Sequence, residues 1–466
     1  MDITNRNGVV NDPSHARVLI LKNDQTTLVI VSVDVVAFEN IGPIQHPYIP
    51  TVRAAVEKEL GIKGANILFN ASHCHSSTAS DSDQRTIKAI KQAAANLVPV
   101  KIGVGVGHED RIQENRRIIL KSGKQFDSRR AYSMPIDDEV AGVGPIDPQI
   151  GILRVDKMNG DTLAVVYQFA CHPIQGVPNG GNTADMTGFS SKVIEENLSP
   201  GTVALFLQGC GGDINPIHYK QVDKPTDAEP LGNMLALSTL KTVRKIKTAA
   251  TDDIKLINEQ LTLPRADYAD RIEQMLSEQR VLLKSLRGTF LNLDSFLPLA
   301  VKYKLSEFPS YYSHGYLHEK KLGRSTLEKL DASNRRNIDA YIRNIITMEK
   351  LTRLQTNLVL LQRHQQTMVA SGKRTIDVEL VGMKVGDFVL VTSPGELTVQ
   401  VGLNIKKRSP HKHTFVSGYT NGYIYYAPTA EQLKNVGWAQ EDSDCLLAPE
   451  WHKVFDDRVD ALLKKL

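Results

Sequence analysis

The chain has 466 residues and a formal net charge of +4, with 41% hydrophobic, 23% charged and 6% aromatic residues. This length predicts about two or three domains, and the composition is that of a globular protein with a large core. Because no dense Lys/Arg block with interleaved aromatic residues occurs, we expect no nucleic acid among its partners.

No uncharged apolar run approaches the roughly 18 residues that a membrane helix requires. The first residues also lack the basic and apolar regions of a signal peptide. We therefore expect a protein with no transmembrane segment, located in the cytoplasm, or secreted if a leader has been removed. Its expected partner is a small-molecule substrate. The four cysteines show no paired framework typical of a disulfide scaffold, and the sequence leaves the oligomeric state open.

The segments 17–22 and 28–37 predict a β-hairpin. Its second strand is apolar almost throughout, which is typical of a strand covered by helices on both faces. Asp34 interrupts that run and is either a strand-end residue or part of a polar site, because an unpaired carboxylate is unfavourable in such a strand. The next elements are a helix, a strand and a helix, at 51–60, 66–69 and 83–96. This β-β-α-β-α order favours an α/β layered domain with a mixed sheet.

The strand at 66–69 runs into a short segment of small residues that carries His73 and His75. Side chains two positions apart on a strand share a face, so both imidazoles would look into one cavity, and they would stay neighbours if the chain bends first. Neutral imidazole is a frequent zinc ligand, and a histidine that titrates near neutral pH can serve as a general acid or base. Taken alone, the pair is equally typical of a polar loop, because a catalytic zinc needs about three protein ligands.

The middle of the chain continues the α/β pattern. Further strands are expected at 101–106, 147–155, 163–170 and 203–208, and a helix is expected at 189–197. The strand at 163–170 runs out into His172, and Pro173 ends its pairing. After 203–208, three glycines in four residues permit a close approach of backbone segments. They do not form a phosphate-binding loop, because the Gly-Lys-Ser/Thr ending is missing.

A charged helical pattern begins near 265 and ends near 372, around an aromatic segment at 290–316. We therefore expect an α/β domain made of 1–264 and 373–466, with a helical insertion at 265–372. The insertion would either pack against the α/β body or form a cap whose aromatic segment contacts an apolar part of the substrate.

The last part of the chain returns to strands, at 375–381 and 387–392, and the second strand leads to Glu396, a carboxylate at a strand-to-helix turn. A tyrosine-rich segment at 419–428 follows, and a helix at 454–463 closes the chain. The predicted fold class is therefore α/β (α+β), a layered mixed-sheet domain with a helical insertion.

Six short motifs fall in the order seen in one enzyme family. They are Ala71-Ser72-His73-Cys74-His75-Ser76, Asn115-Arg116, Phe169-Ala170-Cys171-His172-Pro173, Gly212-Asp213-Ile214-Asn215-Pro216, Ser393-Pro394-Gly395-Glu396-Leu397-Thr398 and Asn421-Gly422-Tyr423-Ile424-Tyr425-Tyr426. Together they resemble the catalytic domain of the neutral ceramidases, which are zinc amidases, from about residue 2 to the C-terminus. Each motif alone is weak, whereas the ordered set is specific.

The resemblance implies a zinc ion bound by His73, His172, Glu396 and Tyr423, with Tyr426 as a competing phenol ligand or a substrate contact. Independently of it, two imidazoles and one carboxylate form the ligand set expected of a catalytic zinc. Such an ion lowers the pKa of its water ligand to about 7 and polarises the scissile carbonyl. Singly, each residue has a plainer interpretation as a strand-end, helix-terminal or core residue.

The resemblance also implies roles for residues around the metal. His75 would move a proton to the leaving group or stabilise the developing oxyanion, and Arg116 would hold a carbonyl or carboxylate oxygen. Asn215 stands where ceramidases carry a serine described as catalytic. An amide cannot relay a proton as a hydroxyl can, but its NH2 group can donate to an oxyanion. Asp213 is expected to contact the substrate.

These observations predict a zinc-dependent amidohydrolase that acts on an amide-linked small molecule. Metal-activated water would attack the carbonyl, and Tyr423, His75 and Arg116 would stabilise the oxyanion. The alternatives are the same metal site acting on an ester or another polar metabolite, and a metal-binding protein that lost catalysis when the serine became Asn215. The β-sandwich domain of ceramidases has no counterpart in the sequence, so whether the substrate is a membrane lipid, as for ceramidases, stays open.

Overall fold

The computed structural model describes residues 1–466 except 43, 45–46, 129–134, 177–180, 218, 220–225, 308, 310–313 and 436–438. The chain divides into two compact units. The first, which we call the α/β unit, is made of Met1–Arg130, Ile136–Asp267 and Arg363–Leu466, and the second, the helical unit, consists chiefly of Tyr268–Gln362. The domain limits at 264/265 and 372/373 stay a prediction.

The strands are β1 (Ala16–Lys22), β2 (Thr27–Val33), β3 (Ile67–Ala71), β4 (Val100–His108), β5 (Gln113–Asn115), β6 (Arg117–Leu120), β7 (Gln125–Asp127), β8 (Val140–Val143), β9 (Gln149–Lys157), β10 (Thr162–Phe169), β11 (Val203–Gln208), β12 (Ile214–Pro216), β13 (Ile254–Pro264), β14 (Thr375–Val385), β15 (Phe388–Thr392), β16 (Glu396–Leu397), β17 (Thr414–Ser417) and β18 (Tyr426–Ala427). The helices are α1 (Tyr48–Leu60), α2 (Ser82–Ala95), α3 (Asp185–Glu196), α4 (Glu229–Val243), α5 (Ala269–Ser285), α6 (Leu293–Leu305), α7 (Gly315–Lys321), α8 (Thr326–Ser371), α9 (Val399–Arg408), α10 (Gln440–Ser443) and α11 (Trp451–Leu463).

Three sheets form the body of the α/β unit. In the first, β1 pairs with β2 antiparallel and β2 pairs with β3 parallel. The second has the order β11-β10-β9-β4, in which β10 and β11 are parallel. The third has the order β13-β14-β15-β17, in which β15 and β17 are parallel. Parallel and antiparallel pairs occur in each sheet, so the predicted mixed-sheet α/β class is confirmed.

The β2 strand shows why its sequence is apolar at nearly every position. Leu28 and Ile30 belong to a central core that the three sheets share, whereas Val29 and Val31 belong to a second core that includes residues of α1 and α2. Successive side chains of a strand point to opposite faces, so a strand buried on both sides needs apolar residues throughout. Burying each such side chain stabilises the fold by roughly 1.5–3 kcal/mol.

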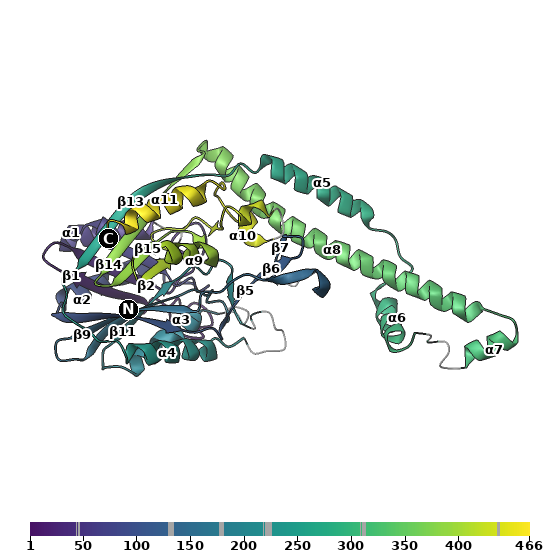
Figure 1. Ribbon diagram of the computed structural model, residues 1–466, viewed down its shortest axis with the longest axis horizontal. Coiled ribbons are helices and arrows are strands. Elements are labelled where there is room, and N and C mark those ends of the chain that lie inside the picture. Colours follow the sequence, from purple (N-terminus) through teal and green to yellow (C-terminus); the bar gives the residue numbers. More distant parts are fainter. Residues whose placement is uncertain are drawn as a thin grey trace. The chain divides into compact units, whose positions relative to one another are not determined.

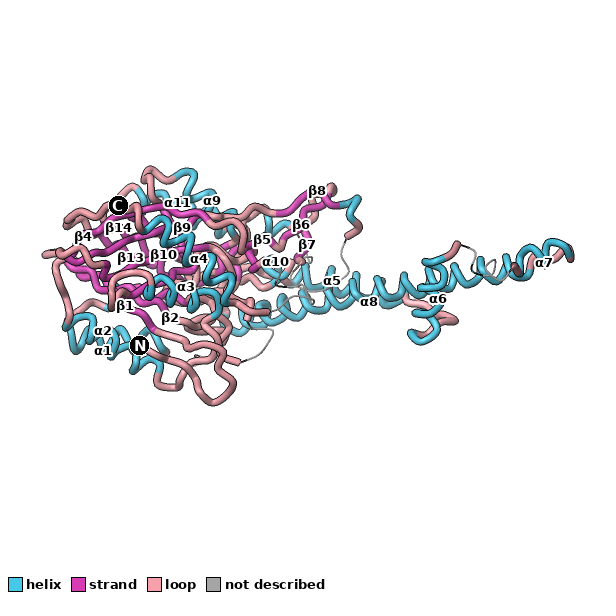
Figure 2. Tube along the Cα trace, turned by 90° about the horizontal axis from the view of Figure 1, so that it is seen from below, coloured by secondary structure: helices cyan, strands magenta, loops and turns pink. Residues whose placement is uncertain are grey.

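Helix pairs cover the outer faces of the three sheets. α1 and α2 pack on the first sheet, α3 and α4 on the second, and α9 and α11 on the third. Figure 1 shows α3 and α4 side by side, and Figure 2 shows α1 and α2 on one side of the strands and α9 and α11 on the other. The helix predicted at 51–60 forms as α1 and ends, as expected, at Gly61, whose φ is +68°.

The carboxyl ends of the central strands carry the polar motifs of the sequence. His73 follows β3, His172 follows β10, and Glu396 comes a few residues after β15. In α/β folds, ligands typically bind where the carboxyl ends of strands meet. β2 itself ends at Val33, so Asp34 is a strand-end residue, and it is paired with Arg17 at 3.0 Å.

The helical unit is built from α5, α6, α7 and most of α8. α8 runs without interruption from Thr326 to Ser371, and its residues from Arg363 onward belong to the α/β unit. Tyr303 and Tyr316 both donate hydrogen bonds to Asp331, which ties α6 and α7 to α8. Three aromatic residues of the predicted aromatic segment lie outside the described residues: Phe308, Tyr311 and Tyr312. In the described part of the chain, every helix is too short or too polar to cross a lipid bilayer.

Candidate metal centre

Three buried side chains from distant elements converge in the α/β unit. They are His73, His172 and Glu396, and each is 2% exposed. One ligand atom of each side chain, an imidazole nitrogen or a carboxylate oxygen, lies within 4.8 Å of the other two. Nitrogen and oxygen atoms grouped in this way could hold a metal ion.

The two histidines of the His-x-His motif lie in different environments. β3 ends at Ala71, and His73 has a φ of +69°, a left-handed conformation that is uncommon outside glycine and recurs at functional sites. The His73 amide donates to the carbonyl of Val35 at 2.9 Å. The ring centroids of His73 and His75 are 5.2 Å apart, and His75 is exposed. The imidazoles therefore remain neighbours, as expected for a chain that bends, but only His73 is buried.

Backbone carbonyl groups fix the two buried imidazoles. Nδ1 of His73 lies 2.7 Å from the carbonyl oxygen of Val36, and Nδ1 of His172 lies 3.0 Å from that of Ile214. Because a carbonyl oxygen only accepts hydrogen bonds, each Nδ1 carries a proton, and in the neutral ring each Nε2 keeps its lone pair. Metal-binding histidines are typically held in this way.

Both Nε2 atoms face one oxygen of Glu396. Oε2 lies 3.2 Å from Nε2 of His172 and 3.5 Å from Nε2 of His73. With neutral imidazoles these three atoms are all acceptors, so their convergence is favourable only with a cation or a proton among them. Burial opposes ionisation of Glu396, but when the imidazoles of His73 and His172 are protonated, their positive charge and the hydroxyl of Tyr423 outweigh burial and hold the pKa of Glu396 well below its usual value.

Two tyrosine hydroxyls donate to the same carboxylate. Tyr423 donates to Oε1 of Glu396, and Tyr419 donates to Oε2 at 3.0 Å. Burial, and after it the charge of Glu396, raises the pKa of both phenols well above the usual value, so both remain protonated donors. The structure thus brings Tyr423 to the group of His73, His172 and Glu396 through the carboxylate.

A cluster of buried ions surrounds the predicted substrate-holding arginine. Nε of Arg116 lies 2.5 Å from Oε1 of Glu441, and its Nη2 donates to the hydroxyl oxygen of Tyr426 at 3.1 Å. The neighbouring Arg117 donates from Nη2 to Oδ1 of Asp442 at 2.6 Å. Both arginine residues are 1% exposed. The hydrogen bonds of Arg116 described here are therefore made to protein groups, and one of them holds Tyr426.

No family model matches the sequence. The crystal structure of neutral ceramidase from Pseudomonas aeruginosa has a TM-score of 0.60 and 16% identity, with 98% of this chain and 70% of that chain covered. A ceramidase complexed with C2 has a TM-score of 0.60 and 15% identity, with 98% and 71% covered. The chain has the neutral ceramidase fold. The resemblance predicted from the six motifs is therefore confirmed. At 15% and 16% sequence identity, the likeness to these two structures establishes the fold alone.

Within the ceramidase fold, Asn215 lies in β12 and is fully buried. Its Oδ1 accepts a hydrogen bond from Nη1 of Arg116 at 3.0 Å. Among the described residues, its Nδ2 has no hydrogen-bond partner. Because Arg116 can only donate, the orientation of the amide is fixed, and Asn215 presents its NH2 group as a donor.

Asp213, expected at the substrate, makes its contacts inside the protein. Its Oδ1 accepts from the amide of Val399, the first residue of α9, at 2.8 Å. A carboxylate at a helix N-terminus is favourable because it faces the positive end of the helix dipole. Burial raises the pKa of Asp213. The described contacts give Asp213 the role of holding α9 against the segment that precedes β12.

Two glycines of the ceramidase fold allow backbone segments to meet around Glu396. A Cβ atom on Gly212 would lie 2.6 Å from the carbonyl oxygen of Glu396, and one on Gly418 would lie 2.7 Å from that of Gly395. Both distances are too short for any residue with a side chain, so glycine is required at both positions. The close approach predicted for the glycine-rich segment thus occurs, and it is made with the strand that carries Glu396.

Sequence reasoning missed two residues of this region, Tyr419 and Glu441. Tyr419 had a usable signal, because it lies two residues after the buried strand β17 and precedes Tyr423 by four positions. Glu441 had none, because its partner Arg116 is 325 positions away.

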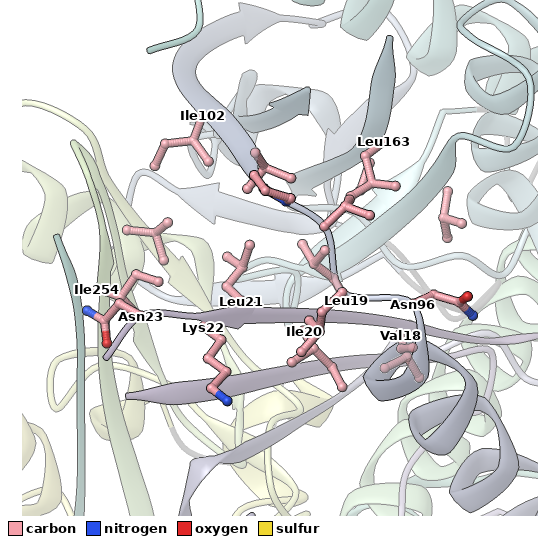
Figure 3. Close-up of a pocket in the computed structure, with 18 of the residues that line it drawn as sticks. Val18, Leu19, Ile20, Leu21, Lys22, Asn23, Asn96, Ile102, Leu163 and Ile254 are labelled. Carbon is pink, nitrogen blue, oxygen red and sulfur yellow. The ribbon is translucent and has the colours of Figure 1, made fainter. Parts of the chain in front are cut away.

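A half-open cavity of about 750 Å³ lies elsewhere in the α/β unit. Apolar side chains of β1 line it together with Ile102 of β4 and Leu163 of β10, as Figure 3 shows. None of the predicted site residues lines this cavity. A chemical site needs a few convergent polar groups, and those are found at the carboxyl ends of the strands instead.

Proposed function

We propose that the protein is a zinc-dependent hydrolase that cleaves an amide bond in a small molecule. The observation that carries this proposal is the convergence of His73, His172 and Glu396, whose ligand atoms lie within 4.8 Å of one another. The neutral ceramidase fold supports the assignment, because two solved structures that share it are ceramidases.

The donor set fits a catalytic zinc. Two neutral imidazoles and one carboxylate are a common three-residue set for such an ion, and the structure fixes both Nε2 lone pairs toward Oε2 of Glu396. When bound, zinc supplies a Lewis acid for the carbonyl and lowers the pKa of a water molecule. Tyr423 and Tyr419 hold the carboxylate that would complete the set.

His75 is the residue placed to move a proton. It is exposed, and its ring lies 5.2 Å from that of His73. An imidazole nitrogen can both donate and accept a proton, so an accessible His75 can give a proton to the leaving amine and take one back in the next turnover. Two residues away from a metal ligand, it would act on the substrate without holding the ion.

Asn215 would stabilise the negative charge that develops on the substrate oxygen. Its Nδ2 is a buried donor, and Arg116 fixes its orientation through Oδ1. A fixed donor aimed at a developing oxyanion typically contributes about 10²–10³ in rate. Arg116 would then act through Asn215 and Tyr426, both of which it contacts. No serine is required for this route.

The test combines metal analysis with a substrate panel. We expect the purified protein to contain about one zinc ion per chain, by inductively coupled plasma mass spectrometry. We expect hydrolysis of N-acyl compounds, its loss after treatment with a chelator, and its return when zinc is added. The panel includes ceramide, ester analogues of the N-acyl compounds and sugar-derived amides, so that the preferred bond and the leaving group are both identified. A metal-free protein that still hydrolyses the amides would contradict the proposal.

A metal-binding protein without hydrolase activity is the second candidate. Asn215 in place of the family's catalytic serine favours it, since an amide cannot become a nucleophile. In that case the protein would contain zinc but remain inert on every compound of the panel. The Asn215→Ser variant would then restore hydrolysis, whereas under the first proposal it would lower the rate or leave it unchanged.

A further inference from the structure

Tyr419 contacts two of the three candidate metal ligands with different parts of its side chain. Its hydroxyl donates to Oε2 of Glu396 at 3.0 Å. Its ring centroid lies 4.2 Å from that of the His73 imidazole, with the two planes tilted by 37°. The side chain is 0% exposed. A shift of Tyr419 would therefore displace both the carboxylate oxygen and the imidazole.

The backbone of Tyr419 is held in a conformation that bulky residues seldom adopt. Its φ is +53°, in the left-handed region. Its carbonyl accepts from the amide of Ala71 at 3.1 Å, and its own amide donates to the carbonyl of Gly395 at 3.4 Å. Tyr419 is thus tied to the end of β3, two residues before His73, and to the residue before Glu396. Strained residues that the surroundings hold in place cluster at functional sites.

The two phenols at Glu396 occupy different oxygens. Tyr423 donates to Oε1, whereas Tyr419 donates to Oε2, the oxygen that also faces both Nε2 atoms. An acceptor oxygen has two lone-pair directions, and the hydroxyl of Tyr419 occupies one of them. The second lone pair of Oε2 is then left to face the Nε2 atoms of His73 and His172.

We propose that Tyr419 is a positioning residue of the metal centre, which orients Oε2 of Glu396 through its hydroxyl and His73 through its ring. The inference rests on the proposed function, because it concerns the same metal. Partners that orient the ligands of a metal typically change its affinity by about 10–100-fold when they are removed. Tyr419 therefore adds a residue to the site that none of the six sequence motifs contains.

Tyr48 provides a matched control for the hydroxyl of Tyr419. It is 1% exposed, and its hydroxyl lies 2.5 Å from Oγ1 of Thr86, a neutral partner. It belongs to the core between the first sheet and helices α1 and α2. The substitution Tyr48→Phe thus removes the same atom from an equally buried ring, outside the candidate site.

The experiment measures zinc affinity of the full chain after metal removal, by competition with a chromophoric chelator. We expect Tyr419→Phe to weaken zinc binding by about 10–100-fold relative to the wild type, and Tyr48→Phe to leave it unchanged. Tyr419→Leu, which also removes the ring, should weaken binding further. Circular dichroism and thermal unfolding of the metal-free variants show whether each is folded before its affinity is compared.

A second readout separates a positioning residue from a ligand. At saturating Co²⁺, the visible absorption of Tyr419→Phe should keep the shape and intensity of the wild-type spectrum, because the ligand set is unchanged. A spectrum typical of a lost ligand, or zinc affinity equal to that of Tyr48→Phe, would overturn the inference. If His172→Ala binds zinc as tightly as the wild type, the proposed function fails instead, so the two failures are distinct.

Discussion

The ion cluster around Arg116 and Arg117 and the candidate metal-ligand cluster of His73, His172 and Glu396 are both buried, but their polar groups are balanced differently. In the ion cluster each guanidinium faces a carboxylate, at 2.5 Å for Arg116 and 2.6 Å for Arg117. In the metal-ligand cluster, two imidazole lone pairs face a carboxylate oxygen at 3.2 and 3.5 Å.

This difference separates a structural group from a binding group. In the ion cluster each positive group faces a negative one, so its charges are compensated within the protein without a further component. The metal-ligand cluster brings acceptors together and is complete only with a cation or with protons on the imidazoles. The comparison predicts that substitutions in the first cluster change the stability of the fold, and that substitutions in the second change metal binding and activity.

The largest effect is expected for His172→Ala, which removes one of the three ligand atoms. Two protein ligands do not hold a catalytic zinc, so the zinc content should fall from about one ion per chain to background, and hydrolysis should disappear. Mass spectrometry of the dialysed protein measures the zinc. If His172→Ala keeps its zinc, the three side chains are not the metal site.

His75→Gln should keep the zinc and lose rate. Removing a general acid typically costs about 10²–10⁴ in kcat, while the ligand atoms remain in place. His108→Gln is the control, because His108 is an exposed histidine of β4 that pairs with Asp110 at 3.2 Å. Steady-state kinetics together with zinc analysis separate the two effects. Equal rates for the two variants would exclude His75 from catalysis.

Arg117→Leu should destabilise the fold and leave metal binding intact. Losing one partner of a buried ion pair leaves an uncompensated charge on Asp442, which typically costs about 3–5 kcal/mol in the free energy of unfolding. Urea denaturation measures the loss, and the folded fraction should still bind zinc. Lys453→Leu, which breaks an exposed pair with Asp457, should cause no measurable change. Loss of zinc in a folded Arg117→Leu protein would show that the two clusters are not separable.

The smallest expected effect is on the pH dependence of stability. Here Glu396 and Asp442, one from each cluster, should act with opposite signs. The folded-state pKa of Glu396 lies below its ordinary value of 4.5, so its ionised form contributes stability above about pH 4.5, which is lost as pH falls through the folded-state pKa. Burial raises the pKa of Asp442 above 3.8, so its ionisation lowers stability as pH rises from 3.8.

Thermal unfolding of the metal-free protein between pH 3 and 7 tests these signs. The stability difference between wild type and Glu396→Gln should shrink as pH falls below about 4.5. The wild type should lose stability as the pH rises above 3.8, and Asp442→Asn should reduce this loss. The same pH dependence in both variants would contradict the contrast between the clusters.

The sequence predicted the parts of the fold in which local pattern and burial agree. The run from Leu28 to Val33 is apolar because both faces of β2 are covered, and this is visible without coordinates. α4 and β13 were missed. α4 presents a broad apolar surface with little periodicity, and β13 is half-exposed with polar residues in its middle.

Part of the candidate site could also be predicted, because histidine and carboxylate at strand ends carry a chemical meaning by themselves. The roles of Tyr419 and Asp213 could not. Tyr419 has a left-handed backbone and donates to Glu396, 23 positions away, and Asp213 accepts a hydrogen bond from the first residue of α9, while its predicted substrate contact stays a prediction. Such roles depend on how distant segments meet, which a single sequence does not encode locally.

The three candidate ligands come from the early, middle and late parts of the chain, which bears on when a cation can be acquired. A nascent chain on the ribosome has no complete donor set until Glu396 has emerged and β15 has joined its sheet. Closing so long a loop is slow compared with local contacts, so the α/β topology must assemble before the ion arrives. Loading of the proposed metal site would therefore be a late step of folding, and refolding without metal followed by addition of a chosen ion should yield the same topology.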